Sequence, residues 1–558
     1  MNVVRPAGLS QSYWPAVSGR APRRLTMQAV VAQATARSPD RIALVDGVPE
    51  PDRRRRWTYR ELQRRSDKIA VALLEQFAPG DRVALWGPNS AEWVFFQIGA
   101  GLAGLVLVTV NPAYRDAELT QVLSRSEVRG LYYVPEYRGR NLEEIAVRAT
   151  ASIATIELLS RLDDLIASAD AMEPDRPLPY VDVTDIAQIQ YTSGTTGAPK
   201  GAMLTHGSIS ASYYQTIRRA GFDEDTPPTW IAPMPLFHIG GAGGATVGTM
   251  THAGTHVIVP GFDVDLMFDL IEAEGGSLTL AVPTMLLSIL EHPRLVDHDL
   301  SSLRTILTGA APVPAELVRR VHDTLHANVV ICFGQTEFSG NLSTTRLDDS
   351  PEAIASTVGM PLDDVEVKIV DAVSGDIVPI GASGEICARG HHVMAGYHNA
   401  PAETAAAISK DGWLRFGDVG TMDERGYLRI IGRVKDMVIR GGENVYPREI
   451  EDLLITHPLV GDVAVVGAPD ETWGEEVAAV VRLAPGVSDD ADPTELFEFC
   501  RARLAGYKCP RLWFYATSFP LTPSGKIQKH RLVAMITDGE LQPVGNYARK
   551  VGQAPGQS

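Results

Sequence analysis

A short run of hydroxyl and glycine residues that leads to a lysine has the composition of an anion-binding loop. It reads Tyr191-Thr-Ser-Gly-Thr-Thr-Gly-Ala-Pro-Lys200-Gly and follows an apolar, strand-like segment. Glycines let the backbone approach a ligand closely, while hydroxyls and backbone N–H groups can satisfy phosphate oxygens. The run does not match the GxxxxGK[ST] phosphate loop. It therefore indicates a phosphate site of another kind, the alternative being a flexible surface turn.

Five further segments combine glycines with residues that could contact a nucleotide or a carboxylate. They are Phe333-Gly-Gln-Thr-Glu337, Gly412-Trp-Leu-Arg-Phe-Gly-Asp418, Gly432-Arg-Val-Lys-Asp436, Gly441-Gly-Glu-Asn-Val-Tyr-Pro-Arg-Glu-Ile-Glu451 and Pro523-Ser-Gly-Lys526. In type and order these segments and the first loop resemble the signature motifs of the adenylate-forming superfamily. That superfamily contains acyl-CoA synthetases, luciferases and the adenylation domains of peptide synthetases. The resemblance spans roughly residues 25–540, and Phe416 departs from it because Thr is common there.

The resemblance implies a two-step reaction on ATP. A carboxylate attacks the α-phosphate to give acyl-AMP and pyrophosphate, and a thiol then displaces AMP. Such chemistry needs cations and fixed donors where negative charge concentrates. Thr336 would donate to the α-phosphate, and Glu337 would hold Mg²⁺, unless it is only an acid at a helix N-terminus. The residues expected to hold the β- and γ-phosphates are Thr192, Ser193, Gly194, Thr195, Thr196, Gly197 and Lys200.

The resemblance also implies a nucleoside site. Phe333 and Gly334 would lie against adenine, which the backbone of Gly309, Ala310 and Ala311 would line. Asp418 would accept hydrogen bonds from both ribose hydroxyls, as carboxylates do for nucleosides. Arg433 would contact ribose or phosphate. The alternatives are a core aromatic residue for Phe333 and a surface residue beside a turn for Arg433.

The C-terminal motifs imply a moving domain. Lys526 would bridge the carboxylate and α-phosphate oxygens in the transition state of the first step. Lys435 occupies the position of a hinge that absorbs backbone rotation between the two steps. Gly441 and Gly442 would then form a wall of the tunnel for the pantetheine arm of coenzyme A, although a plain glycine turn would look the same.

The acyl side of the site is indicated by Pro235-Leu-Phe-His238 and by the small residues of 240–246. His238 is expected to be a catalytic-site gate between acyl pocket and thiol tunnel, or else a satisfied core histidine. The small residues would leave room for a medium or long acyl chain, or else permit tight helix packing. No acid occurs from 236 to 250 to pair an ammonium group, which disfavours amino acids. Asn111-Pro-Ala-Tyr-Arg115 is similar to a stretch common in medium- and long-chain acyl-CoA synthetases.

The motifs together predict an ATP-dependent carboxylic acid–CoA ligase for a medium- or long-chain fatty acid, with ATP, Mg²⁺ and coenzyme A bound. An acyl-AMP ligase that loads a carrier protein and an aryl acid–CoA ligase are alternatives. A non-catalytic acyl- or nucleotide-binding protein on the same fold is a further one. The intact loop 441–446 favours coenzyme A as the acceptor.

The elements that must position these residues alternate helical stretches with short apolar strands between residues 60 and 430. This alternation predicts an α/β fold with two parallel-sheet subdomains. From about residue 357, closely spaced strands and glycine turns predict a small antiparallel β subdomain. We expect an N-terminal AMP-binding domain at 1–434, a small mobile α+β domain with the catalytic lysine at 435–540, and a flexible tail at 541–558.

The composition excludes several protein classes. With 51 basic and 68 acidic residues the net charge is −17, which argues against a nucleic-acid partner. The 45% of hydrophobic and 21% of charged residues exclude global disorder. Four cysteines without CxxC spacing favour a reducing cytoplasm and no zinc site. The apolar run 93–110 reads as helix, glycine turn and strand, so we expect no integral membrane segment. A homodimer is one option for the assembly, which the sequence leaves open.

Overall fold

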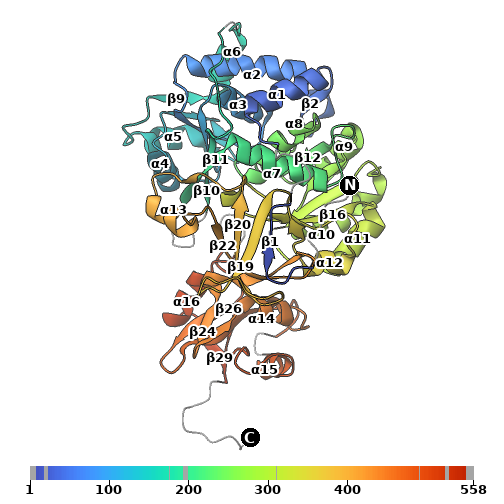
Figure 1. The fold of residues 1–558 in the computed structure, drawn as a ribbon, viewed down its shortest axis with the longest axis vertical. Coiled ribbons are helices and arrows are strands. Elements are labelled where there is room, and N and C mark those ends of the chain that lie inside the picture. Colours follow the sequence, from blue (N-terminus) through green and yellow to red (C-terminus); the bar gives the residue numbers. More distant parts are fainter. Residues whose placement is uncertain are drawn as a thin grey trace, which may run out of the picture.

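The computed structural model describes residues 8–17, 23–174, 176–192, 199–309, 311–488, 491–521 and 527–547. Three sheets and their helices form the larger part of the molecule, and a fourth sheet forms a smaller unit at one end (Figure 1). Among the predicted site residues, seven lie outside the described residues: Ser193, Gly194, Thr195, Thr196, Gly197, Ala310 and Lys526.

The first α/β sheet has seven strands. Five of them are parallel and continue to one edge of the sheet, and the two strands at the other edge pair antiparallel. Its strands alternate between two cores: Val83 and Leu85 belong to one, Ala84 and Trp86 to the other. Both faces are therefore buried, which explains the apolar strand sequences. In sheet order the strands are β21 (Gly396–Tyr397), β11 (Lys200–Thr205), β10 (Ile186–Thr192), β5 (Val106–Val110), β4 (Arg82–Trp86), β6 (Gly130–Tyr133) and β9 (Leu158–Arg161).

The second α/β sheet has nine strands, with antiparallel pairing at its two edges and parallel pairing between. One core cluster includes Leu44 and Ile258 of this sheet and Leu85 and Leu107 of the first, so a continuous core joins the two. In sheet order the strands are β18 (Met360–Pro361), β17 (Ser343–Thr344), β16 (Asn328–Phe333), β15 (Thr305–Gly309), β14 (Leu278–Leu280), β12 (Thr229–Ala232), β13 (Thr255–Ile258), β2 (Ile42–Asp46) and β3 (Arg56–Thr58).

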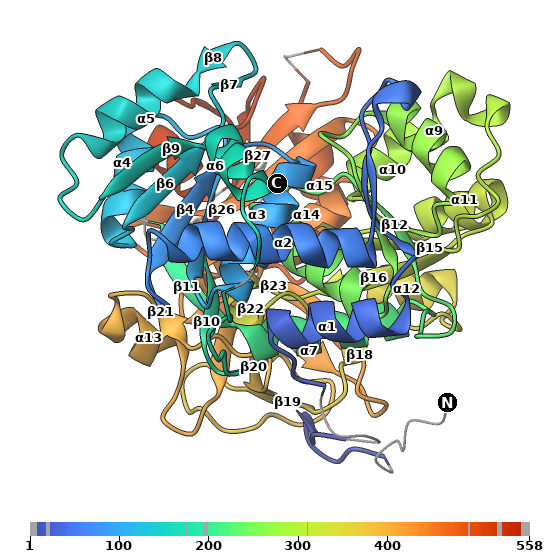
Figure 2. The ribbon, with the colours of Figure 1, turned by 90° about the horizontal axis from the view of Figure 1, so that it is seen from above.

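In the view from above, the outer helices of the first α/β half (cyan) lie on the left and those of the second half (yellow-green) on the right, while two blue helices cross the middle (Figure 2). Several begin at side-chain caps; in α2, Thr58 and Glu61 form a reciprocal capping box. The helices of this part are α1 (Met27–Arg37), α2 (Tyr59–Leu74), α3 (Ala91–Leu102), α4 (Asp116–Arg125), α5 (Leu142–Thr150), α6 (Leu162–Asp170), α7 (His206–Arg219), the π-helix η2 (Gly240–Gly248), α8 (Thr249–Thr251), α9 (Val264–Glu274), α10 (Pro283–Leu290), α11 (Ala315–Leu325) and α12 (Pro351–Ser356).

A β subdomain and several short elements complete the larger part of the molecule. An antiparallel sheet of five strands packs below the two α/β halves and contains β1 (Tyr13–Trp14), β19 (Val365–Val370), β20 (Gly384–Gly390), β22 (Leu414–Met422) and β23 (Leu428–Arg433). The remaining pieces are η1 (Pro51–Arg53), β7 (Glu136–Tyr137), β8 (Arg140–Asn141), η3 (Pro293–Asp297), η4 (Thr336–Phe338), α13 (Pro401–Ala407) and η5 (Val434–Asp436).

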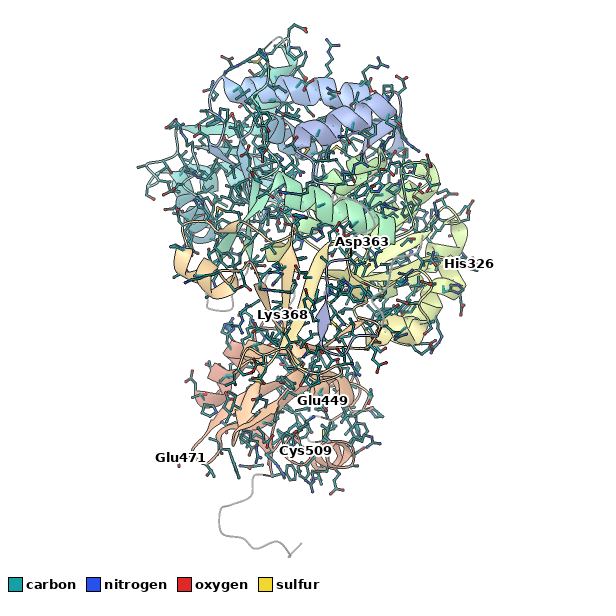
Figure 3. All side chains as sticks on the ribbon, viewed as in Figure 1. His326, Asp363, Lys368, Glu449, Glu471 and Cys509 are labelled. Carbon is teal, nitrogen blue, oxygen red and sulfur yellow. The ribbon has the colours of Figure 1, made fainter. Side chains whose placement is uncertain are left out.

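The C-terminal unit follows η5 and has its own core around Val438, Val477 and Trp513. Figure 3 shows it below the β subdomain, with Glu449, Glu471 and Cys509 marking its extent. Its elements are β24 (Val438–Arg440), β25 (Glu443–Val445), α14 (Pro447–Leu454), β26 (Val460–Asp470), β27 (Gly474–Leu483), α15 (Thr494–Arg501), β28 (Leu512–Tyr515), α16 (Lys529–Thr537) and β29 (Pro543–Asn546).

The predicted fold class is confirmed: two mostly parallel α/β sheets, a β subdomain and a small α+β unit. The apolar run 93–110 is α3 followed by β5, and no helix in the described part of the chain is long and apolar enough to span a bilayer. The structure departs from the expectation of a flexible tail at 541–558 in one segment. Residues 543–546 form β29, which pairs with β28, and the Tyr547 ring stacks on Phe497 with 4.2 Å between centroids.

Candidate active site

The polar motif residues gather where parallel strands of both α/β sheets end. Thr192 is the last residue of β10 in the first sheet, and Phe333 is the last of β16 in the second. Loops at the carboxyl ends of parallel strands are the usual place for ligand contacts in α/β folds. Thr192 Oγ1 lies 3.2 Å from Glu337 Oε1 and donates to it, so the two sheets are joined at this point.

Thr192 and Lys200 stand at the two ends of the predicted phosphate loop. β10 and β11 form an antiparallel hairpin in which Thr192 pairs with Lys200. Residues 193–198 between them lie outside the described residues. The hairpin nevertheless holds the two ends of the loop near Glu337, because Thr192 contacts Glu337 and pairs with Lys200.

Tyr397 contacts two of these groups and was not predicted from the sequence. Its hydroxyl donates to Glu337 Oε1 at 2.8 Å, and Lys200 Nζ lies 5.2 Å from the centre of its ring. Burial, and then the Glu337 charge, raise the pKa of the Tyr397 phenol. The phenol is therefore a stable hydrogen-bond donor to the carboxylate at neutral pH. No local pattern in the sequence marks Tyr397, since it sits in a strand of only two residues.

Glu337 has the chemistry to take part in a magnesium site. Both of the hydrogen bonds described above go to its Oε1. In the described ranges no group of three or more His, Cys, Asp and Glu side chains could hold a metal ion. Mg²⁺ commonly uses one or two carboxylates and takes its other ligands from substrate phosphates and water. A single carboxylate beside a phosphate loop fits that pattern.

Two glycines keep the ends of β15 and β16 free of side chains. A Cβ at Gly309 would lie 2.3 Å from the carbonyl oxygen of Cys332, and one at Gly334 would lie 1.9 Å from that of Gly340. Both positions therefore require glycine. Thr336 follows in the short helix η4 and is buried, whereas Ala311 is exposed.

Phe333 belongs to a cluster of three aromatic rings. Its ring centre lies 5.8 Å from that of Phe416, which in turn lies 5.4 Å from that of Phe338. Phe333 is half-buried, and the other two are buried. Phe416, the departure from the family pattern, thus supports the ring predicted to lie against adenine.

Asp418 and Arg433 face each other across strands β22 and β23. Arg433 Nε donates to Asp418 Oδ1 at 3.1 Å. The Asp418 side chain is 10% exposed and that of Arg433 is 47% exposed. Arg433 ends the last strand before η5, so this pair lies at the boundary of the C-terminal unit.

His238 is exposed, so the alternative that it is a core histidine is wrong. It follows β12 in a loop that Asn89 holds by accepting from Leu236 N and donating to Met234 O. Thr109 Oγ1 also donates to the carbonyl oxygen of Phe237 at 2.8 Å. These contacts fix the loop beside β5 and leave the imidazole accessible.

The glycines after His238 permit tight helix packing. A Cβ at Gly243, Gly244 or Gly248 would lie within 3 Å of the Tyr213 side chain in α7. Helix η2 is buried throughout. At these three positions the space left by glycine is filled by Tyr213, so they do not enlarge a pocket.

Gly441 and Gly442 form the tight turn between β24 and β25 in the C-terminal unit. Their φ values are 60° and 87°, a left-handed conformation that favours glycine. Lys435 lies in η5, between β23 and β24. The structure thus brings Thr192, Lys200 and Glu337 together and pairs Asp418 with Arg433, while the glycine turn stands on the separate C-terminal unit.

Comparison with protein families gives two matches. Residues 31–398 match the family model described as AMP-binding enzyme. Residues 449–526 match the model described as AMP-binding enzyme C-terminal domain.

Individual proteins are similar over nearly the whole chain. A mitochondrial medium-chain acyl-CoA ligase from Macaca fascicularis is 35% identical over 90% of this chain and 85% of its own. A putative acyl-CoA synthetase from Bacillus subtilis is 35% identical over 91% of this chain and 96% of its own. The crystal structure of ATP-bound MatB from Rhodopseudomonas palustris is 29% identical with a TM-score of 0.81, covering 92% of this chain and 99% of that one.

Proposed function

The chain belongs to the AMP-binding enzyme family of adenylate-forming acyl-CoA synthetases, and from this premise we propose that it joins medium-chain fatty acids to coenzyme A at the expense of ATP. The observation that carries the proposal is the meeting of Thr192, Lys200 and Glu337 at the carboxyl edges of two sheets. The chain length follows from the similarity to medium-chain acyl-CoA ligases.

In the first proposed step, a carboxylate oxygen of the acid bonds to the α-phosphorus of ATP. The bond from that phosphorus to the bridging oxygen breaks, and pyrophosphate leaves with the electron pair. Lys200 and the loop 192–197 would hold the β- and γ-phosphates. Thr336 and Lys526 would stabilise the negative charge that develops at the α-phosphate. Mg²⁺ held by Glu337 would neutralise phosphate charge. The contacts of Thr192 and Tyr397 with Oε1 support this role because they fix the carboxylate.

In the second proposed step, the thiol sulfur of coenzyme A bonds to the acyl carbon, the bond from that carbon to the AMP oxygen breaks, and the thiol proton passes to solvent. Lys435 would act as the hinge that turns the C-terminal unit. Gly441 and Gly442 would then line the path of the pantetheine arm. Their exposure and left-handed backbone support this role, since a turn without side chains can approach a thin ligand.

We assign the nucleoside to Phe333, Asp418 and Arg433 together with the backbone of Gly309, Ala311 and Gly334. The contact between Asp418 and the half-exposed Arg433 supports this assignment, because it places a carboxylate for the ribose hydroxyls beside a guanidinium group for ribose or phosphate. His238 would stand between the acyl group and the thiol, and its exposed imidazole is consistent with that place. A cytoplasmic location and a homodimer stay predictions.

The proposal is tested by incubating the purified protein with ATP, Mg²⁺, coenzyme A and a panel of C2–C18 and aromatic acids. Pyrophosphate, acyl-AMP and acyl thioester are followed by mass spectrometry. We expect thioester from the medium-chain acids. Acyl-AMP without thioester would point to a carrier protein as the acceptor, and no product from any acid would contradict the ligase proposal.

A further inference from the structure

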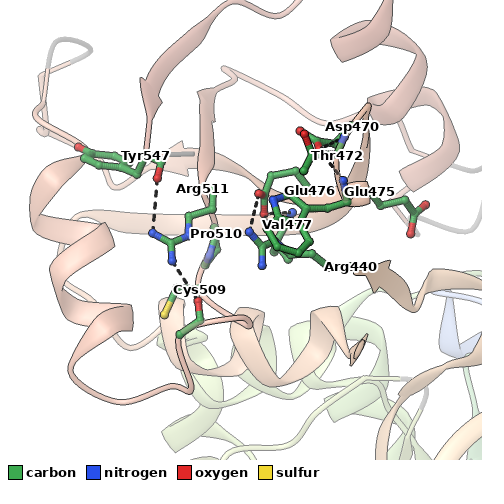
Figure 4. A network of polar contacts seen from close by, with 12 residues as sticks. Arg440, Asp470, Thr472, Glu475, Glu476, Val477, Cys509, Pro510, Arg511 and Tyr547 are labelled. Atoms are coloured by element: carbon green, nitrogen blue, oxygen red, sulfur yellow. Dashed lines mark hydrogen bonds and ion pairs between the residues drawn. The ribbon is translucent and has the colours of Figure 1, made fainter. Parts of the chain in front are cut away.

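Arg440, the residue before the Gly441–Gly442 turn, forms a buried ion pair with Glu476 (Figure 4). Arg440, the last residue of β24, donates from Nε to Glu476 Oε1 at 2.5 Å and from Nη2 to Oε2 at 2.9 Å. The Arg440 side chain is 13% exposed and that of Glu476 is 1% exposed. A two-point contact between guanidinium and carboxylate fixes orientation as well as distance.

The same arginine ties the turn to the loop between β26 and β27. The Arg440 guanidinium carbon lies 4.8 Å from the centre of the Trp473 ring. The N–H of Gly441 donates to the carbonyl oxygen of Trp473 at 2.9 Å, and a Cβ at Gly441 would lie 2.6 Å from that ring. The turn is thus held against Trp473 by its backbone and by the side chain that precedes it.

Neighbouring contacts hold that loop in turn. Asp470 Oδ1 accepts from the backbone N–H groups of Thr472 and Trp473 at 2.9 and 2.8 Å. Glu475 Oε2 accepts from Ile439 N at 2.7 Å. Figure 4 shows Glu476 facing Arg440, with Asp470 and Thr472 at the adjoining turn. Two adjacent glutamates of β27 therefore both bind the strand that leads into the glycine turn.

A buried ion pair is an inefficient way to stabilise a domain, because removing two charges from water offsets most of their attraction. The C-terminal unit already has an apolar core at Val438, Val445 and Val477, which flank the pair in sequence. Two neighbours of the pair stay accessible: Ile439, the residue before Arg440, is 51% exposed, and Trp473 is 42% exposed. The pair thus orients an exposed turn whose conformation the core beneath it does not fix.

We propose that Arg440 and Glu476 are positioning residues for the thiol-transfer step, because they hold the Gly441–Gly442 turn in the orientation that this step uses. The inference rests on the proposed function, in which the turn lines the path of the pantetheine arm. In this proposal neither residue takes part in acyl-AMP formation. A change in the pair should therefore affect only thioester formation.

The test compares Glu476→Gln and Arg440→Lys with the wild-type chain in the two half-reactions. Acyl-AMP formation is measured by pyrophosphate release without coenzyme A, and thioester formation is measured from enzyme-bound acyl-AMP by rapid mixing with coenzyme A. We expect thioester formation to fall about 100-fold in Glu476→Gln, the loss typical of a reacting group displaced by about 1 Å. Acyl-AMP formation is expected to stay at the wild-type rate. Arg440→Lys keeps the charge without the two-point contact, and its loss is expected to be smaller.

Asp462→Asn is the matched control, since it removes the carboxylate of a different ion pair in the same unit. That pair joins Asp462 of β26 to Arg482 of β27. Asp462 Oδ2 lies 3.7 Å from Arg482 Nη2, and both side chains are about 40% exposed. The control is expected to leave both half-reactions unchanged. Equal loss of both half-reactions in Glu476→Gln would overturn the inference, because Lys526 belongs to the same unit and a structural defect would affect it too. Unchanged thioester formation would also overturn it. A wild-type chain that makes no acyl-AMP would instead contradict the proposed function.

Discussion

At the residue scale, the carboxylate of Glu337 has its place set by neighbours from two other parts of the chain. Thr192 and Tyr397 both donate to its Oε1, at 3.2 and 2.8 Å. A hydrogen bond to a charged group contributes about 1.5–3 kcal/mol, more than one between neutral groups. Tyr397 also presents its ring to Lys200, so one side chain touches two groups of opposite charge.

The variant Tyr397→Phe removes the phenol and keeps the ring. We expect acyl-AMP formation to fall roughly 10-fold and to need more Mg²⁺, because a hydrogen bond to the Glu337 carboxylate is lost while the contact with Lys200 remains. Pyrophosphate release titrated against Mg²⁺ measures both effects.

A second phenol provides the control for this variant. Tyr13 donates to Glu366 Oε2 at 2.7 Å within the β subdomain, so Tyr13→Phe removes the same kind of bond elsewhere. It should leave the Mg²⁺ titration unchanged. If both variants shift that titration equally, Tyr397 has no specific role at Glu337.

At the element scale, strand β13 carries a histidine into the core of the second sheet. His256 pairs with Trp230 of β12 and Leu44 of β2. It is 2% exposed, and neither ring nitrogen has a hydrogen-bond partner among the described residues. Burial lowers the pKa of His256 to about 3. The folded state therefore keeps this histidine neutral, while an unfolded chain protonates it near its ordinary pKa of about 6.5.

This difference makes stability depend on pH in a definite direction. Between about pH 6.5 and pH 3 the unfolded state binds one more proton at His256, so stability falls as the pH falls. At pH 5 the loss from this residue is about 2 kcal/mol. Between pH 7 and pH 5 the free energy of unfolding of the wild type should therefore fall by about 2 kcal/mol more than that of His256→Leu. Urea denaturation at the two pH values measures this difference.

His322→Gln is the control for this measurement, because His322 has a 71% exposed side chain on α11. The wild type and this variant should show the same pH dependence. A His256→Leu variant that weakens in acid as much as the wild type would mean that His256 is protonated in the folded protein.

At the scale of the whole molecule, the proposed reaction needs two parts of one small domain in turn. The glycine turn lies between β24 and β25, and Lys526 follows β28, 84 positions after Gly442. Both motifs belong to the C-terminal part of the chain, so in the proposed reaction alternate use of them would require the C-terminal unit to turn, with Lys435 as the proposed hinge.

The variant Lys526→Ala tests this division of labour. We expect acyl-AMP formation to fall about 100–1000-fold, as when one donor to a developing negative charge is removed. Conversion of supplied acyl-AMP to thioester should continue at the wild-type rate. The two rates are measured separately, and an equal loss in both would reject the assignment of Lys526 to the first step.

The sequence by itself determined many of the buried strands and the order of the motifs. Strands such as β4, β5 and β15 are buried on both faces, so their apolar runs could be recognised without any partner. Helix α3 and strand β5 were separated correctly because glycines punctuate the run between them. Local signals of this kind depend on periodicity and turn residues, which are properties of neighbours in the chain.

Only the tertiary structure decided which groups meet. Tyr397 is 60 positions from Glu337, and Glu476 is 36 positions from Arg440. Strand β29 in the expected tail and the packing of Gly243 against Tyr213 likewise depend on distant partners. A hydrogen bond or a close contact is set by three-dimensional pairing of strands and helices, and it leaves no periodic trace in the sequence on either side.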